Sequence, residues 1–338
     1  MVDDVDIFDW TSFDVFELEE RTSGGPLRCV FRLLLERCGL VHLVDAVRLD
    51  SFLGELERLY AAGGNPYHTN LHAADVVATA GTMMKVDSGS LTAFRDWELL
   101  SLVIACAGHD VGHQGVTNAY HARLKTDWYR LYASGENKRE SVNSINELAH
   151  AEITLSLLRQ DRHDFLRTME ADKREKVLEY VEKMILRTDI TWHEDVCERF
   201  VRACRKSADD WAEEDRVQIL SGLLHFADVS NPGRPWKLCK RWAELLHDET
   251  LQEREKVATH GIALSGTDGS DAEQRHASTS LECSQIEFIK STILPFCDQV
   301  SLVSPRFAET IRPHLDESVE AWTRLASHEG KSGNLEPL

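Results

Sequence analysis

The hydrophobic and polar residues of this chain alternate mainly with the period of an α-helix. In residues 26–40, "PLRCVFRLLLERCGL", apolar side chains recur three and four positions apart, as they do on one face of an amphipathic helix. Gly39 follows the last turn of this pattern and predicts the end of the helix. The same periodicity predicts helices over residues 49–64, 71–85, 97–108, 145–160, 174–189, 211–228, 234–252, 283–300 and 306–326.

Alternating strand patterns joined by Asn-Gly or Asp-Gly turns are nearly absent, so we predict an all-α protein. No long linker rich in glycine, proline or serine divides the chain, and no segment repeats with a period of about 20–50 residues. We therefore expect one domain over residues 1–338, with a core of about residues 10–328. Residues 264–280, "LSGTDGSDAEQRHASTS", have the composition of a mobile surface loop.

The composition and net charge of the chain limit the kinds of molecule that we expect it to bind. The chain has 338 residues and a formal net charge of −19, which disfavours nucleic acid or an anionic membrane surface because like charges repel. It disfavours an anionic substrate too, unless bound cations reverse the local field.

No apolar run approaches the roughly 20 residues of a membrane span, and the acidic N-terminus is not typical of a signal peptide. We therefore expect a cytoplasmic protein, and the eight cysteines, none in a C-x-x-C pair, favour reduced thiols.

Polar residues of the types that bind metals interrupt the apolar pattern near three helix ends. In "NPYHTNLHAADV", Asn65 is expected to cap a helix that begins at Pro66. His68, His72 and Asp75 would then share one face of that helix, because they lie four and three residues apart. Taken alone, such a histidine pair is as often incidental as it is a metal site.

The other two helix ends carry the same residue types. His109-Asp110 follows "LLSLVIACA", with His113 expected on the same side, and His225 precedes Asp228 by three residues in "LLHFADVSNP". Burying these groups without a cation would cost several kcal/mol, so together they predict a metal site. Two imidazoles and two carboxylates with open positions suit zinc, manganese or iron. Asp110 has two oxygens and could bridge to a second ion, and paired metals are typical of phosphoryl chemistry.

The order His72, His109-Asp110, Asp228 resembles the H…HD…D signature of the HD-domain phosphohydrolases. More closely, the chain resembles the catalytic domain of the class I cyclic nucleotide phosphodiesterases. The resemblance runs through "FDVFELEE", "NPYHTNLHAADV", "HDVGHQGVTN", "ILRTDITWH", "LLHFADVSNP" and "SQIEFIKSTILPF". It implies a compact domain of about 16 helices that hydrolyses 3′,5′-cyclic nucleotides to 5′-monophosphates.

The resemblance also implies roles for individual residues. His72, His109, Asp110 and Asp228 would hold the first metal, zinc, and Asp110 would bridge to a second, magnesium or manganese. The groups expected to act through metal-bound water are His113, Glu147 and Thr188. His68 matches the general acid that protonates the departing O3′ while a metal-bridging hydroxide attacks phosphorus. The residues matching the substrate pocket are Tyr67, Asn231, Leu246, Gln285 and Phe288.

Three departures from the family pattern concern groups around this site. Thr69 stands where the family has asparagine after the first histidine, and Leu148 and Ala149 replace two polar residues. Thr250-Leu251 replaces paired phenylalanines, which should alter the rim of the pocket.

The resemblance also implies regulatory domains on a longer parent chain, because catalytic domains of this family usually have N-terminal regulatory modules.

Several alternatives stay open from the sequence. A glutamine amide can present either edge, so Gln285 does not distinguish adenine from guanine, and cAMP and cGMP both remain substrates to test. The competing hypotheses are an HD-type phosphohydrolase acting on nucleoside mono- or triphosphates, a catalytically silent nucleotide- or metal-binding module, and a purely structural helical bundle. The first gives no reason for the Gln285 and Phe288 pair, and the last two leave an intact set of polar helix ends unexplained.

Overall fold

A computed structural model describes residues 5–87, 91–133, 143–259 and 280–332. These residues form α-helices and short 3-10 turns with no strand among them, which confirms the all-α prediction. The α-helices are α1 (Val15–Thr22), α2 (Pro26–Arg37), α3 (Ala46–Ala61), α4 (Asn70–Val86), α6 (Asp96–Gly108), α7 (Asn118–Leu124), α8 (Asp127–Tyr132), α9 (Ile145–Leu158), α10 (Ala171–Ile185), α11 (His193–Cys204), α12 (Glu213–Val229), α13 (Trp236–Thr259), α15 (Leu281–Phe288), α16 (Leu294–Val300) and α17 (Pro305–Ser332).

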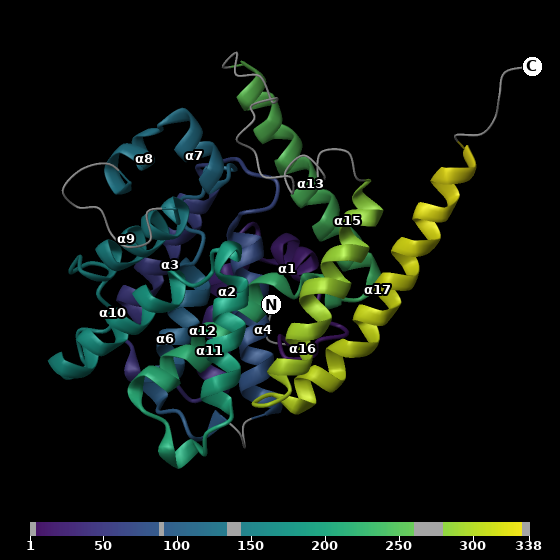
Figure 1. The fold of residues 1–338 in the computed structure, drawn as a ribbon. Coiled ribbons are helices and arrows are strands. Elements are labelled where there is room, and N and C mark those ends of the chain that lie inside the picture. Colours follow the sequence, from purple (N-terminus) through teal and green to yellow (C-terminus); the bar gives the residue numbers. More distant parts are fainter. Residues whose placement is uncertain (1–4, 88–90, 134–142, 260–279, 333–338) are drawn as a thin grey trace, which may run out of the picture.

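The interior of the fold is built around helices α4 and α6. Both are buried on almost all sides, and a helix that is apolar around its whole circumference must lie inside the protein. α2, α12 and α10 pack around this pair, and α11 packs outside α12. Figure 1 shows the long α17 at one edge of the molecule, where it packs against α15 and α16. Most of the buried apolar side chains of these elements belong to one continuous cluster.

The region predicted as one helix over residues 283–300 is divided in two. α15 ends at Phe288, a π-helical turn spans Ile289–Ile293, and α16 begins at Leu294. Pro295 explains the interruption, because a proline has no N–H and its ring crowds the carbonyl four residues earlier. The wider π turn accommodates this crowding without ending the helical path.

The start of α4 corrects a second prediction. Thr69, rather than Asn65, is the N-cap of this helix, and its hydroxyl accepts a hydrogen bond from the backbone N–H of Leu71 at 3.2 Å. Asn65 is used elsewhere, since its amide donates to the carbonyls of His68 at 3.2 Å and His113 at 2.7 Å. His68 therefore lies in the turn before α4, and not on the helix face that carries His72.

Two further predictions concern the chain as a whole. No helix in the described part of the chain combines the length and the apolar character that crossing a membrane requires. The loop predicted at residues 264–280 lies outside the described residues except for Ser280. The single-domain organisation over residues 1–338 stays a prediction.

Candidate active site

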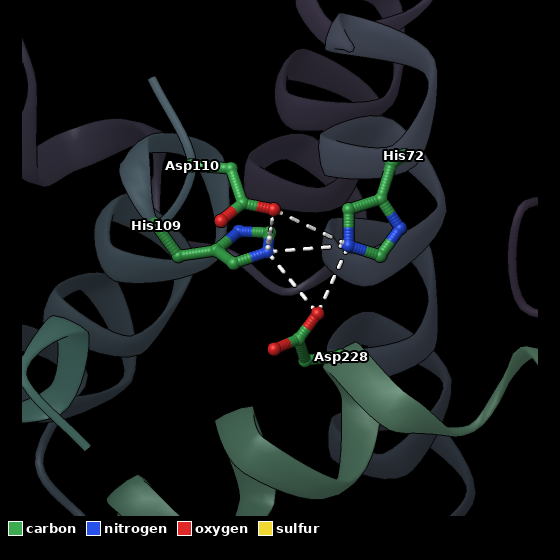
Figure 2. Close-up of side chains that lie close together, drawn as sticks. All are labelled: His72, His109, Asp110 and Asp228. Atoms are coloured by element: carbon green, nitrogen blue, oxygen red, sulfur yellow. Dashed lines mark hydrogen bonds and ion pairs between the residues drawn. The ribbon is translucent and has the colours of Figure 1, made fainter. Parts of the chain in front are cut away.

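The ends of three helices bring two histidines and two aspartates together. His72 comes from the first turn of α4, His109 and Asp110 directly follow α6, and Asp228 comes from the last turn of α12. Figure 2 shows the four side chains pointing toward one another. Nε2 of His72 lies 2.9 Å from Oδ1 of Asp228 and 3.3 Å from Nε2 of His109. The four nearest ligand atoms all lie within 4.8 Å of one another.

These separations fit one divalent cation. Nε2 of His109 lies 3.0 Å from Oδ2 of Asp110 and 3.3 Å from Oδ1 of Asp228, and Nε2 of His72 lies 3.5 Å from Oδ2 of Asp110. Ligands bound to zinc at about 2.0–2.2 Å are separated from one another by similar distances. Nδ1 of His109 lies 2.9 Å from the carbonyl oxygen of Cys106 and must donate to it, because a carbonyl only accepts. The lone pair of Nε2 is thereby free to face a cation.

The charges of the cluster also favour a cation. Burial by itself lowers the pKa of His109, but the carboxylates of Asp110 and Asp228 outweigh burial and raise this pKa well above its ordinary value. Burial by itself raises the pKa of Asp110, but His109 and His68 hold it well below its ordinary value. The site therefore strongly stabilises positive charge between the carboxylates, and a divalent cation supplies that charge more effectively than a proton does.

His150 is a further group beside the cluster that the sequence reasoning missed. Its Nδ1 donates to the carbonyl of Val111 at 2.9 Å, and its Nε2 lies 3.8 Å from Oδ1 of Asp110. Burial lowers the pKa of His150 to about 4, and Nε2 is buried without a hydrogen-bond partner. Nε2 of His150 and the Asp110 carboxylate both accept hydrogen bonds, so a water molecule between them, free or bound to a metal, would donate to both. Its position three residues after Glu147 was the signal available in the sequence.

His68 lies beside the cluster and is held by a residue that the sequence reasoning also missed. The carboxylate of Glu249, in α13, contacts Nδ1 of His68 and accepts hydrogen bonds from the backbone N–H groups of Tyr67 at 3.0 Å and His68 at 3.1 Å. Burial lowers the pKa of His68, but Asp110 and Glu249 outweigh it and raise this pKa to about 9. The two carboxylates therefore favour the imidazolium form of His68, with Nδ1 committed to Glu249.

His113 stacks against this acid. Its ring lies 3.9 Å from the ring of His68, at an interplanar angle of 25°. Burial and the positive charge of His68 hold the pKa of His113 well below its ordinary value. The backbone N–H of Gly115 donates to Nδ1 of His113 at 3.0 Å, so the neutral ring carries its proton on Nε2. The two neighbouring histidines thus differ in charge, one being an acid and the other a neutral donor.

A cavity of about 610 Å³ opens in front of the cluster. Its lining includes all of the predicted site residues except His72 and His109, which are buried behind it: Tyr67, His68, Asp110, His113, Glu147, Thr188, Asp228, Asn231, Leu246, Gln285 and Phe288. The lining also contains the apolar side chains of Ile190, Val229, Pro232, Trp242 and Ala243. Gln285 and Phe288 lie one turn apart on α15 and both reach the cavity, as their spacing predicted. Across it, the Asn231 amide donates to the Tyr67 hydroxyl at 2.6 Å.

A network of polar groups forms another wall of the cavity. The amide of Asn118 donates to Oε2 of Glu147 at 2.9 Å, and burial, reinforced by nearby Asp189, raises the pKa of Glu147 to about 8. Asp189 accepts from the hydroxyl of Ser144 at 2.6 Å and from the backbone N–H of Thr191 at 2.9 Å. Asp189 thus holds the turn that presents Thr188 to the cavity.

Two residues singled out in the sequence lie outside the cluster. Asp75 points away from His72 and forms a buried ion pair with Arg234, with 2.6 Å between Oδ1 and a guanidinium nitrogen. His225 lies against His193, with 3.1 Å between ring nitrogens. The predicted shared face of His68, His72 and Asp75 is therefore wrong, because His68 precedes the helix and Asp75 faces the segment after α12.

Comparisons of the sequence and of the structure with known proteins both find phosphodiesterases. The sequence signature of the 3′5′-cyclic nucleotide phosphodiesterase family matches residues 67–314. A human relative, dual specificity calcium/calmodulin-dependent 3′,5′-cyclic nucleotide phosphodiesterase 1B, is 29% identical over 307 residues, which cover 90% of this chain and 53% of the relative. The corresponding phosphodiesterase 1 of Drosophila melanogaster is 31% identical over 260 residues, 76% of this chain and 30% of the relative. The chain spans about half the length, or less, of these curated relatives.

Solved structures match the fold over nearly the whole chain. The phosphodiesterase domain of the RhoPDE fusion protein from the choanoflagellate Salpingoeca rosetta has a TM-score of 0.79 at 22% identity and covers 97% of this chain and 98% of its own. LmjPDEB1 in complex with IBMX has a TM-score of 0.83 at 20% identity, covering 96% of this chain and 94% of its own. At such identities the likeness establishes the arrangement of the helices.

Proposed function

Because the chain belongs to the 3′,5′-cyclic nucleotide phosphodiesterase family, we propose that it hydrolyses 3′,5′-cyclic nucleotides to 5′-nucleoside monophosphates. The observation that carries this proposal is the convergence of His72, His109, Asp110 and Asp228 at the polar end of the cavity. A phosphate at that end places the purine among apolar walls. The two ends of the cavity therefore match the two ends of a nucleotide.

The four clustered side chains would hold the first divalent cation, zinc, and the second oxygen of Asp110 would reach a second, magnesium or manganese. When bound, such a pair polarises the phosphate and lowers the pKa of a coordinated water. This positive charge also offsets the chain's net charge of −19, which would otherwise repel the phosphate. His113, Glu147 and Thr188 would orient water molecules around the metals.

His68 is the group that would protonate the leaving oxygen. Its Nδ1 proton is committed to Glu249, so the proton on Nε2, at the far side of the ring, is the one available to O3′ of the ribose. After transfer, the neutral ring keeps Nδ1–H directed at Glu249. The carboxylate therefore keeps the ring in place throughout the reaction.

The purine would lie between the Phe288 ring and the Leu246 side chain, with the Gln285 amide hydrogen-bonding to its edge. Relatives named as dual specificity enzymes make cAMP and cGMP the two substrates to compare. Because those relatives are longer, we propose regulatory domains on a longer parent chain. A cytoplasmic location stays a prediction.

The decisive experiment is steady-state hydrolysis of cAMP and cGMP, measured in parallel with added magnesium and with a chelator. We expect the chelator to abolish turnover and the addition of zinc together with magnesium to restore it. dGTP and 5′-dAMP serve as comparison substrates. Preferential hydrolysis of either would favour another HD-type phosphohydrolase and overturn the proposal.

Two variants test the assignments within the site. Asp228→Asn should abolish turnover and reduce bound metal, whereas Asp209→Asn, at an exposed position remote from the cavity, should do neither. His68→Ala should lower kcat by about 10²–10⁴-fold, the usual contribution of a general acid, with metal content unchanged. Metal loss in His68→Ala would show that this histidine is a ligand.

A further inference from the structure

One face of α13 lies along the candidate active site, where it contacts the metal-binding cluster, the cavity and the candidate acid. Along this helix Trp242, Leu246, Glu249, Glu253 and Lys256 are spaced by four and three residues, so they lie on a single stripe. The Trp242 ring lies 5.9 Å from the ring of His72, Leu246 lines the cavity, and Glu249 holds His68. The two remaining residues of the stripe, Glu253 and Lys256, do not line the cavity.

Glu253 binds the residue that begins α7. Its Oε1 accepts hydrogen bonds from the backbone N–H of Thr117 at 3.2 Å and from the hydroxyl of Thr117 at 2.7 Å. The same hydroxyl is the N-cap of α7, since it accepts from the N–H of Tyr120 at 3.2 Å. A carboxylate that accepts two hydrogen bonds from one residue fixes both the position and the orientation of that residue.

Lys256 binds the segment just before Thr117. Its ammonium donates to the carbonyl oxygens of Gln114 at 3.0 Å and Gly115 at 3.4 Å. Gly115 has φ +63°, and a Cβ there would lie 2.6 Å from Oδ1 of Asn65 and 3.5 Å from Nζ of Lys256, so the backbone packs closely against both residues. The N–H of Gly115 is the donor that sets the tautomer of His113.

The segment held by these two side chains connects to the opposite wall of the cavity. Asn118 directly follows Thr117, and its amide donates to Glu147 while its oxygen accepts from the backbone N–H of Asn146 at 2.8 Å. Residues 113–118 thus run from the neutral histidine beside the acid to Asn118, which binds the cavity-lining side chain of Glu147. A displacement of this segment would move both groups.

We propose that Glu253 and Lys256 are positioning residues, which clamp residues 113–118 against α13 and keep His113 and Glu147 in register with the acid held by Glu249. This inference rests on the proposed hydrolysis of cyclic nucleotides. Neither residue lines the cavity, but the segment that they hold does so through His113 and Asn118, so loss of the clamp should lower kcat more than it changes KM.

The kinetic test compares truncating with conservative variants. Glu253→Ala and Lys256→Met should each lower kcat about 10-fold with little change in KM, because a displacement of a fraction of an ångström near reacting groups costs this much. Glu253→Gln and Lys256→Arg retain the acceptor and the donor, so they should recover most of the lost rate. Glu255→Ala, an exposed position on the same helix, is the control and should keep full activity. A kcat for Glu253→Ala equal to that of the control would overturn the clamp.

A second measurement is independent of activity. Hydrogen–deuterium exchange of the Thr117 amide, a donor to Glu253, should be faster in Glu253→Ala than in Glu255→Ala. Unchanged exchange would contradict the clamp even if kcat falls. If the unaltered enzyme hydrolyses no cyclic nucleotide, the proposed function fails, while the exchange result still decides whether α13 holds this segment.

Discussion

The carboxylate of Glu249 holds His68 at three points: the ring nitrogen Nδ1, the backbone N–H of His68 and the backbone N–H of Tyr67. The two residues are 181 positions apart in the chain and come from α13 and the turn before α4. This buried carboxylate therefore holds the candidate acid in place beside the cluster and, together with Asp110, favours its charged form. This pairing makes the strength of the acid open to test.

Glu249→Gln should weaken the acid. An imidazolium that loses its carboxylate partner is less stable, so the pKa of His68 should fall and the protonated acid should be lost at lower pH. The alkaline limb of the pH profile of kcat should therefore move to lower pH, and kcat should decrease by less than the about 10²–10⁴-fold expected for removing the acid. An alkaline limb that stays in place would show that Glu249 does not govern the acid; Glu255→Gln is the matched control.

The buried ion pair between Asp75 and Arg234 should be essential for stability. Arg234 also lies over the ring of Trp10 at 3.8 Å, so the pair joins the N-terminal segment, α4 and the segment after α12. Asp75→Asn leaves the guanidinium charge buried without its partner, and the free energy of unfolding should fall by about 3–5 kcal/mol in urea denaturation. Replacing both residues with apolar ones should recover much of this loss. A loss below about 1 kcal/mol in the single variant would contradict the assignment.

The contact between α11 and α12 requires a glycine. A Cβ at Gly222 would lie 2.2 Å from the ring of Phe200, which is fully buried. Alanine normally stabilises a helix relative to glycine by about 1 kcal/mol, but Gly222→Ala should instead destabilise the protein by about 1–3 kcal/mol because the interface becomes overpacked. Thermal and urea unfolding measure this, and Phe200→Leu in the same chain should relieve part of the loss. Stabilisation by Gly222→Ala alone would contradict the packing.

His225 should make the protein sensitive to mild acid. Burial lowers its pKa from 6.5 to about 4. Below pH 6.5 His225 becomes protonated in the unfolded chain but stays neutral in the folded chain until about pH 4. The free energy of unfolding therefore falls as the pH drops toward 4, and His225 by itself should account for a loss of about 2 kcal/mol between pH 7 and pH 5. Urea denaturation at both pH values measures it. Burial lowers the pKa of His150 to about 4 as well, so His225→Asn should remove only the share of His225 from the dependence, about 2 kcal/mol, and leave that of His150. The exposed His247→Asn should leave the dependence unchanged. An equally steep dependence without His225 would assign the effect elsewhere.

Much of the secondary structure could be predicted because the apolar spacing of a helix is a local property. The long segments that became α4, α6, α9 and α12 have boundaries within a few residues of those predicted. The apolar pattern does not predict the short helices α1, α7 and α8, since six to eight residues hold too few apolar positions to establish a period, and it does not predict the 12-residue α11 either. The cap of α4 was misplaced because Asn65 and Thr69 are both good caps, and only the contact of Asn65 with His113 decides between them.

The cluster around Asp110 was accessible to sequence reasoning for a physical reason. A polar group at the end of an apolar helix departs from the local pattern, and several such departures in one chain indicate a shared site. Glu249 gives no comparable signal, because a charged residue within an amphipathic helix has the same local pattern whether it faces solvent or a buried partner.

From its amino acids alone, then, this chain determined its helical class and the identity of the residues available to bind metal and substrate, because both depend on neighbours within a few positions. Which of these residues meet was decided by tertiary packing. That packing turned Asp75 toward Arg234 and brought Glu249 to His68. Pairings of this kind depend on the relative placement of helices far apart in the chain, and short-range periodicity carries no information about that placement.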